Sequence, residues 1–325
     1  MKRSVISSVS LAVFACIATS FHGLAAAQNF PSKPIVIVVD SSPGSTTDGL
    51  ARAIANEMTI VIKQAVIVEN KPGAGGGIAA QSVARAAPDG YTVFMTTNTT
   101  QAANPFLFKK LGYDPVKDFT PVSALVKGYL LMVTNPNVKA KTVSDFISLA
   151  RKEPGKFTFG SGSSSARVAG ELFQQMTDVS LTHVPYKANP NAVIDLVSGQ
   201  IDMMIVDLTT SLPQVRSGRL NALGVTSLQR SPLVPDLPTL NETGLPGYQI
   251  SFWNALYAPA NTPDAVVKSL NELMSNSMKK DAVKRFVDQN GMEVFTSTPA
   301  ELKAFQAAEL DRWGKIIKAA RIEPE

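Results

Sequence analysis

The chain has 325 residues, enough for two domains of ordinary size, each with its own hydrophobic core. It carries 31 basic and 26 acidic residues, a bias that suits the collection of small anions but is too weak to indicate a nucleic-acid-binding protein. One cysteine and two histidines are too few for a zinc site of the usual kind, so no metal and no cofactor are expected.

Residues 1–27 have the pattern of a cleavable export signal. Lys2 and Arg3 give a basic start, a short apolar stretch follows, and three alanines form the expected cleavage site. The apolar stretch is too short for a stable membrane anchor, and a lipoprotein signal through Cys16 fits the preceding residues poorly. We therefore expect a soluble exported protein whose mature form has no cysteine and a single histidine, His183.

A strand, a polar turn and a helix open the mature chain. Residues 35–39 are a continuous apolar run, typical of a parallel strand covered on both faces. The turn at 40–48 follows, and the helix after it has Thr47 or Asp48 as its candidate N-cap. Free backbone N–H groups at the positive end of a helix dipole predict an anion-binding site here. The alternative is an ordinary βα turn without a ligand.

Strand-like and helix-like segments alternate along the rest of the chain, which predicts an α/β fold with a largely parallel sheet covered by helices on both faces. The glycine-rich turn at 71–77 lacks the spacing of a phosphate-binding loop, so we assign it to close helix–strand packing. Two helices are expected to finish the chain, the second with a capping box formed by Thr298 and Glu301.

A second polar turn, residues 160–167, precedes another helical stripe. Its serines supply hydroxyls and accessible amides at the helix N-terminus: Ser161, Ser163, Ser164 and Ser165. Arg167 lies in the first turn of the helix, where a cation opposes the dipole, so its placement is more easily explained if it meets an anion. A solvated surface arginine is the alternative.

Polar residues also follow the other predicted strands. Ligands of open α/β sheets collect beyond the carboxyl ends of the strands, where Thr97, Ser42, Ser163 and Asp207 are expected to lie. His183 falls inside a strand-like run, so we expect a structural role for it.

Seven stretches spread over nearly the whole mature chain resemble one known family. They are residues 30–35 (FPSKPI), 68–76 (VENKPGAGG), 87–91 (APDGY), 170–173 (GELF), 183–187 (HVPYK), 230–232 (RSP) and 244–247 (GLPG). Together they are similar to the Bug family of periplasmic solute receptors, the binding-protein partners of tripartite tricarboxylate transporters.

The resemblance implies two doubly wound α/β lobes, of the type II periplasmic binding-protein class, that close like a flytrap on a small carboxylate. It implies that residues 28–125 form lobe 1, that residues 126–249 form lobe 2, and that residues 250–325 return to lobe 1 through the second of two crossovers. It also implies that turns from both lobes hold the ligand. The candidate binding residues are Asp40, Ser41, Ser42, Gly44, Ser45, Thr46, Thr47, Thr97, Asn98, Ser161, Ser163, Ser164, Ser165, Arg167, Ala188 and Asp207.

Several of these positions depart from the family pattern. The run from Asp40 to Ser45 has polar residues where the family usually has PFPPGG or PFAAGG, so the phenylalanine and the second glycine are missing. Arg167 stands where a histidine is usual, and Ala188 replaces a glycine. Asp40 and Arg167 are expected either to pair across the closed cleft or to bind opposite ends of a zwitterionic or dicarboxylic ligand. The alternative is that Asp40 points away and is solvated.

The leading interpretation is a monomeric, non-enzymatic receptor that binds a small carboxylate or an amino-acid-like solute and docks on a membrane permease. An exported serine hydrolase is a second hypothesis, weakened by the absence of a G-x-S-x-G motif and by His183 being the only histidine base. A receptor that feeds a signalling partner is a third, and it differs from the first only in that partner.

Overall fold

The computed structural model describes residues 30–325, so the expected export signal lies outside the described residues. Two sheets share one long strand, β4 (Phe119–Thr134). The sheet of lobe 1 has the order β2 (Val66–Asn70), β1 (Ile35–Val39), β3 (Thr92–Thr97), β9 (Ser251–Pro259) and β4, with β10 (Met292–Val294) also on β4. In lobe 2, β8 (Asn221–Val225) and β7 (Met203–Asp207) pair with β4, and β5 (Thr158–Ser161) and β6 (Thr182–Pro185) follow.

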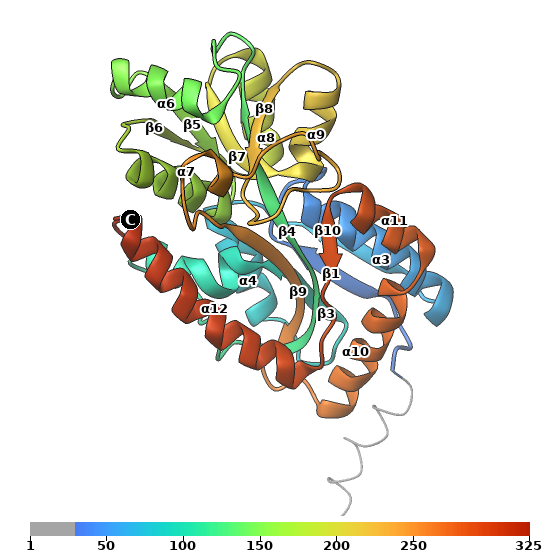
Figure 1. The fold of residues 1–325 in the computed structure, drawn as a ribbon. Coiled ribbons are helices and arrows are strands. Elements are labelled where there is room, and N and C mark those ends of the chain that lie inside the picture. The colour runs from blue at the N-terminus through green and yellow to red at the C-terminus, as the bar shows by residue number, and fades with distance from the viewer. Residues whose placement is uncertain (1–29) are drawn as a thin grey trace, which may run out of the picture.

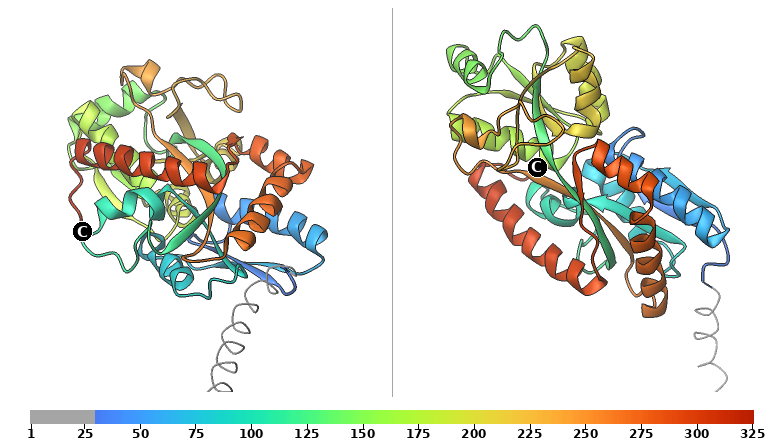
Figure 2. Two further views of the ribbon diagram at one scale, coloured as in Figure 1. Left: turned by 90° about the horizontal axis from the view of Figure 1, so that it is seen from below. Right: turned by 45° about the vertical axis from the view of Figure 1, so that its right-hand side comes forward.

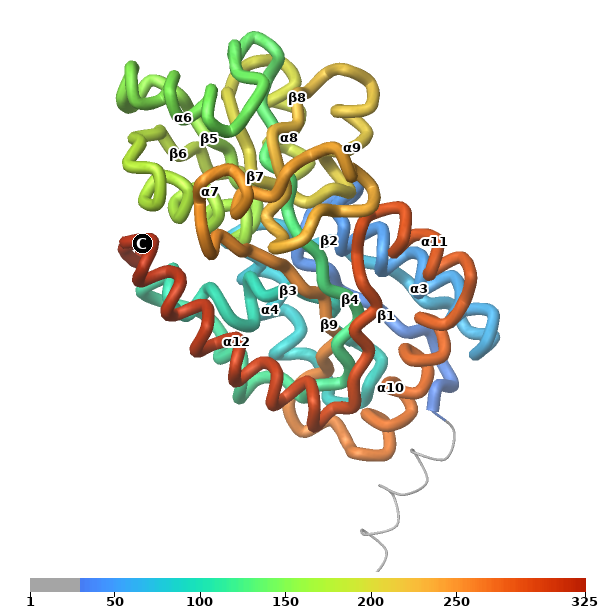
Figure 3. The backbone as a smooth tube through the Cα atoms, in the orientation of Figure 1, coloured from blue at the N-terminus to red at the C-terminus, as the bar shows by residue number. Residues whose placement is uncertain are grey.

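The outer strands of each sheet are parallel, as the alternating pattern predicts. They are β2, β1 and β3 in lobe 1, and β7, β5 and β6 in lobe 2. The middle of the molecule is antiparallel, because β4 and β9 run side by side in opposite directions where the lobes meet (Figures 1 and 3). The α/β two-lobe class is therefore confirmed, whereas the expectation of a largely parallel sheet omitted this antiparallel centre.

Helices cover both sheets (Figures 1 and 2). The helices of lobe 1 are α3 (Thr46–Ile62), α4 (Gly77–Ala84), α5 (Asn104–Leu107), α10 (Asp264–Met278), α11 (Asp281–Gln289) and α12 (Pro299–Ala319), and those of lobe 2 are α6 (Val143–Lys152), α7 (Ser164–Thr177), α8 (Asn189–Ser198) and α9 (Leu208–Arg216). Short helical turns lie at Ala74–Gly76, Thr99–Ala103 and Asn241–Thr243. Although they come last in the chain, α10 and α11 pack against α3, and α12 packs against β4. No helix within residues 30–325 has both the length and the apolar composition needed to cross a bilayer.

The helix ends follow local side-chain chemistry. The capping box of Thr298 and Glu301 is present at the start of α12. The expected N-cap of α3 is wrong by two or three positions, because the Ser45 hydroxyl accepts from the Asp48 N–H and the helix starts at Thr46. Two helices were expected at the end of the chain and three are present. The short α11 was missed, since only Val283 and Val287 of its residues are buried.

Candidate ligand-binding site

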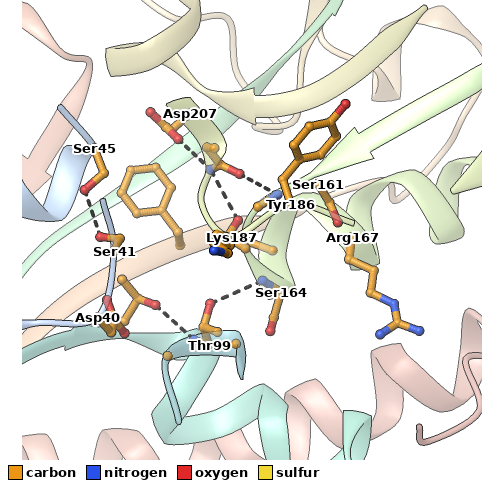
Figure 4. A pocket seen from close by; sticks show the side chains of 18 of the residues that line it. Asp40, Ser41, Ser45, Thr99, Ser161, Ser164, Arg167, Tyr186, Lys187 and Asp207 are labelled. Atoms are coloured by element: carbon orange, nitrogen blue, oxygen red, sulfur yellow. Dashed lines mark hydrogen bonds between the residues drawn. The ribbon is translucent and has the colours of Figure 1, made fainter. Parts of the chain in front are cut away.

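A cavity of about 260 Å³ lies between the lobes, where the carboxyl ends of β1, β3, β5 and β7 meet (Figure 4). Such a volume corresponds to roughly nine water molecules at ~30 Å³ each, so it suits a small organic solute. Most of the predicted residues line it: Asp40, Ser41, Ser45, Thr46, Thr47, Thr97, Ser161, Ser163, Ser164, Ser165, Arg167 and Asp207.

The structure places the other predicted residues outside the lining. Ser42 is turned toward Asn191, to which its hydroxyl donates at 3.3 Å. Gly44 makes the turn with a φ of +81°, and its N–H donates to Asp48. Asn98 is fully buried behind the cavity, and Ala188 is fully buried as the N-cap residue of α8.

Four helices begin at the cavity wall. The lining includes N-cap or first-turn residues of α3 in lobe 1 and of α7, α8 and α9 in lobe 2. The first N–H groups of a helix have no partner within it and carry the positive end of the dipole. The starts of α3 in lobe 1 and of α7 and α8 in lobe 2 therefore offer a small anion donors from both lobes, whereas the start of α9 is capped by Asp207.

Direct hydrogen bonds join the lobes around the cavity, so the structure is closed. Thr46 of α3 donates its hydroxyl to Asp207 at 2.7 Å. The Ser164 N–H donates to the Thr99 hydroxyl at 3.3 Å. Asp207 also accepts a hydrogen bond from Asn189 at 2.9 Å and one from the Thr210 N–H, in the first turn of α9, at 3.0 Å. Its carboxylate is thereby committed to capping α9 and joining the lobes.

Asp40 is buried in the wall of lobe 1 with only 7 % of its surface exposed, so the expectation that it could be solvated is wrong. The Thr96 hydroxyl donates to its Oδ2. Gly76 packs against the side chain, and a Cβ there would lie 3.1 Å from the same Oδ2. Burial raises the pKa of Asp40 to about 6, although the hydrogen bond from Thr96 opposes the shift.

Arg167 does not pair with Asp40, so that alternative is also wrong. Its Nη1 donates to Glu325 at 2.7 Å at the rim of the cavity. The backbone of Glu325 is held by Leu107 and Lys109 of lobe 1, so this ion pair also crosses between the lobes. The expected anion at Arg167 is thus a carboxylate of the protein, and the Nε of Arg167 is buried without a hydrogen-bond partner in the described chain.

His183 lies in the lining rather than in a purely structural position. Its Nε2 is 2.7 Å from the hydroxyl of Ser161, and its ring stacks on Phe159. Burial, together with the positive charge of Arg167, lowers the pKa of His183 to about 4. The imidazole is therefore neutral at neutral pH.

Sequence reasoning missed the remaining lining residues. They are Gly75, Gly76, Thr99, Leu107, Phe108, Leu130, Gly162, His183, Pro185, Tyr186, Lys187, Asn189, Phe252, Asn254 and Glu325. The turn after β6 gave a signal for Tyr186, Lys187 and Asn189, because it follows a strand and precedes a helix. No local pattern marks Phe108 and Phe252, which reach the cavity only through the tertiary fold.

The sequence profile of the tripartite tricarboxylate transporter family receptors matches residues 50–322. The chain belongs to this receptor family. A curated relative, BugT of Bordetella pertussis, is 32% identical over 295 residues, which are 90% of this chain and 90% of BugT.

Solved structures of similar receptors have the same fold. One of Rpa4515 from R. palustris with adipate has a TM-score of 0.89 at 34% identity, covering 91% of this chain and 100% of that protein. One of MatC from Rhodopseudomonas palustris with bound malate has a TM-score of 0.84 at 33% identity, covering 89% and 100%. The periplasmic binding protein BugD has a TM-score of 0.87 at 30% identity, covering 91% and 100%. The resemblance to the Bug family is confirmed.

Within this receptor family, the chain's cavity combines polar helix starts with apolar walls. Phe108 and Phe252 provide aromatic surface, and Ser41 lines the cavity after β1. Residues 30–325 contain no cluster of three or more His, Asp or Glu side chains arranged to hold a metal ion. The lining is thus mixed, with hydroxyls and helix starts beside aromatic and aliphatic side chains.

Proposed function

We propose that the protein is a periplasmic solute receptor that holds a small carboxylate between its lobes and delivers it to the membrane permease of a tripartite transporter. The observation that carries this proposal is the convergence of helix N-termini from both lobes on one closed cavity. Relatives of known structure support the ligand class, since the Rpa4515 structure holds adipate and the MatC structure holds malate.

The proposal assigns a mechanical role to the two lobes. Residues 28–125 with 250–325 act as one body and residues 126–249 as the other, and the ligand favours closure because it contacts both. The contacts between Thr46 and Asp207 and between Ser164 and Thr99 then form only on closure. We further propose that the receptor acts as a monomer and that its closed form is the one the permease binds.

A thermal-shift screen of the purified mature protein against mono- and dicarboxylates, amino acids and aromatic acids tests the function. A ligand at 100 times its Kd that binds only the folded form adds about 2.7 kcal/mol of stability. Ser41→Trp fills the cavity and is expected to abolish the shift, whereas Ser217→Trp, on an exposed turn of lobe 2, is expected to preserve it. A protein that binds no acid of the panel, or an S41W variant that binds like wild type, contradicts the proposal.

The hydrogen bond between Ser161 and His183 gives the hydrolase hypothesis one supporting observation. Two features oppose it. The lowered pKa makes His183 a weak base, and within residues 30–325 no carboxylate accepts a hydrogen bond from its ring. Incubation of any bound acid and of its simple esters with the protein, followed by product analysis, separates the two functions, since a receptor leaves them unchanged.

A further inference from the structure

The charged residues that line the cavity differ in whether they already have partners. They are Asp40, Lys187, Arg167, Asp207 and Glu325. Arg167 and Glu325 pair with each other at 2.7 Å. Asp207 accepts hydrogen bonds at both of its oxygens, from Thr46 and Thr210 at Oδ1 and from Asn189 at Oδ2. Asp40 is the buried acid of this set that has no cationic partner, whereas Glu325 is largely exposed and faces Arg167.

Asp40 is held in place but left without a counter-charge. The Thr96 hydroxyl fixes Oδ2, whereas Oδ1 receives no side-chain hydrogen bond from residues 30–325. No Lys or Arg of the described chain forms an ion pair with it. A buried carboxylate without a cation is unfavourable, and a ligand that supplies one relieves that cost.

The wall around Asp40 is shaped for this side chain. Gly76 adopts a φ of +83°, and a Cβ there would contact both the Asp40 side chain and Thr100. The hydroxyls of Thr96 and Thr100 are themselves within hydrogen-bond distance, so the carboxylate is supported from behind. Figure 4 shows Asp40 beside Thr99 on one side of the pocket, with Asp207 on the other.

The lobe 2 part of the lining suits a carboxylate. The N-termini of α7 and α8 belong to it, and Lys187, just before α8, has no ion pair among residues 30–325. A ligand with a second carboxylate would bring it against Asp40, where like charges repel at low dielectric. A ligand with both a cationic group and a carboxylate can place the first against Asp40 of lobe 1 and the second against the helix starts of lobe 2.

We propose that the solute is a zwitterion, an amino acid or similar compound whose ammonium group contacts Asp40 and whose carboxylate contacts the helix N-termini of lobe 2. This inference rests on the proposed receptor function and narrows its ligand class. Asp40 is then the residue that separates amino-bearing acids from acids that carry only carboxylate and hydroxyl groups.

Two matched pairs of probes test the proposal by isothermal titration calorimetry. Adipate and 5-aminopentanoate share four methylenes and differ in one charged end, whereas malate and aspartate differ by a hydroxyl in place of an ammonium group. In wild type, the amino member of at least one pair is expected to bind ten-fold or more tightly than its partner. In Asp40→Asn, which keeps the shape and the acceptor for Thr96, that preference is expected to disappear.

Asp89→Asn is the matched control, because it removes a surface acid of lobe 1 that pairs with Lys33 away from the cavity, and it is expected to keep the wild-type preference. Asp40→Ser is a second variant with a smaller side chain, and circular dichroism melting establishes that each variant folds. Tighter binding of adipate and malate than of their amino partners, or an unchanged preference in both Asp40 variants, overturns the inference while the receptor function stands. Failure of wild type to bind every acid in the thermal-shift panel overturns the receptor function itself.

Discussion

The loops that open the cavity from each lobe, residues 40–48 in lobe 1 and residues 160–167 in lobe 2, are both strand-to-helix turns rich in Ser, Thr and Gly, yet they place their charges differently. The lobe 1 loop buries its acid, Asp40, against Thr96. In the lobe 2 loop, the basic residue Arg167 lies at the rim of the cavity and pairs with Glu325. The same local chemistry thus gives opposite outcomes, because the partners come from segments remote in the chain.

Replacing one glycine of each loop by alanine is expected to show the largest difference between the loops, measured as loss of the free energy of unfolding. A Cβ on Gly162 would lie 2.0 Å from the backbone carbon of Ala188, so Gly162→Ala has to displace the start of α8. We expect a loss of about 3 kcal/mol or more in the free energy of unfolding, together with loss of ligand binding. In the lobe 1 loop, a Cβ on Gly44 would meet open space, so only the φ of +81° disfavours Gly44→Ala. We expect a loss of about 1–2 kcal/mol in the free energy of unfolding. Urea denaturation measures both, and equal losses would contradict the comparison.

The buried acid of the lobe 1 loop makes stability depend on pH. The pKa of Asp40 is raised from 3.8 to about 6, so the folded state binds this proton more tightly than the unfolded state does. Binding of this proton adds to the free energy of unfolding. That added stability is fully present below pH 3.8 and is lost as the pH rises through 6. At pH 8, Asp40→Asn without ligand is therefore expected to be more stable than wild type by up to roughly 3 kcal/mol, at about 1.36 kcal/mol per pKa unit.

Chemical denaturation at pH 4 and pH 8 measures that difference, which should nearly vanish at the lower pH. Tyr113 is the other titratable group near Asp40, and burial and the Asp40 charge both raise its pKa, so it stays neutral over this range. A gap between wild type and variant that is the same at both pH values would show that Asp40 titrates normally.

The hydrogen bond from Thr46 to Asp207 links the two sides and is expected to have the next largest effect. It is buried and has a charged acceptor, so Thr46→Val should weaken ligand binding by about 1.5–3 kcal/mol, roughly 10- to 100-fold. Thr210→Val is the matched control, because Thr210 donates to the same oxygen from within lobe 2. It should lower stability but change affinity less. Equal changes in affinity by calorimetry would argue against a role of Thr46 in closure.

The rim ion pair is expected to have the smallest effect. Glu325 is 62% exposed at its side chain, so solvent screens its attraction to Arg167. A double-mutant cycle with Arg167→Gln and Glu325→Gln should give a coupling free energy below about 1 kcal/mol. A larger coupling, or one insensitive to salt, would contradict the solvent screening expected from the exposure of Glu325.

The sequence predicts backbone features that depend on near neighbours. Apolar runs located the strands, the capping box at Thr298 placed α12, and the serine turns located the cavity. Features that depend on distant partners were not predictable in this way. Thr96 and Gly76 decide that Asp40 is buried, Glu325 decides where Arg167 points, and each is separated from its partner by tens of residues or more. Local patterns carry no information on such pairings.

The long strand β4 has a consequence for how the receptor opens. Any rotation of one lobe against the other has to pass through the antiparallel pairing of β4 with β9, in which Gly128 and Tyr129 pair with Phe252 and Ser251. The pairing of β4 with β9 is irregular before Val126 and continuous from Val126 to Tyr129, and β4 then pairs with β7 and β8 in lobe 2. The crossover is therefore continuous sheet rather than a loop, and it is expected to twist as one unit. A change in the angle between the lobes therefore changes the twist of this pairing, and the free energy of solute binding includes the cost of that change.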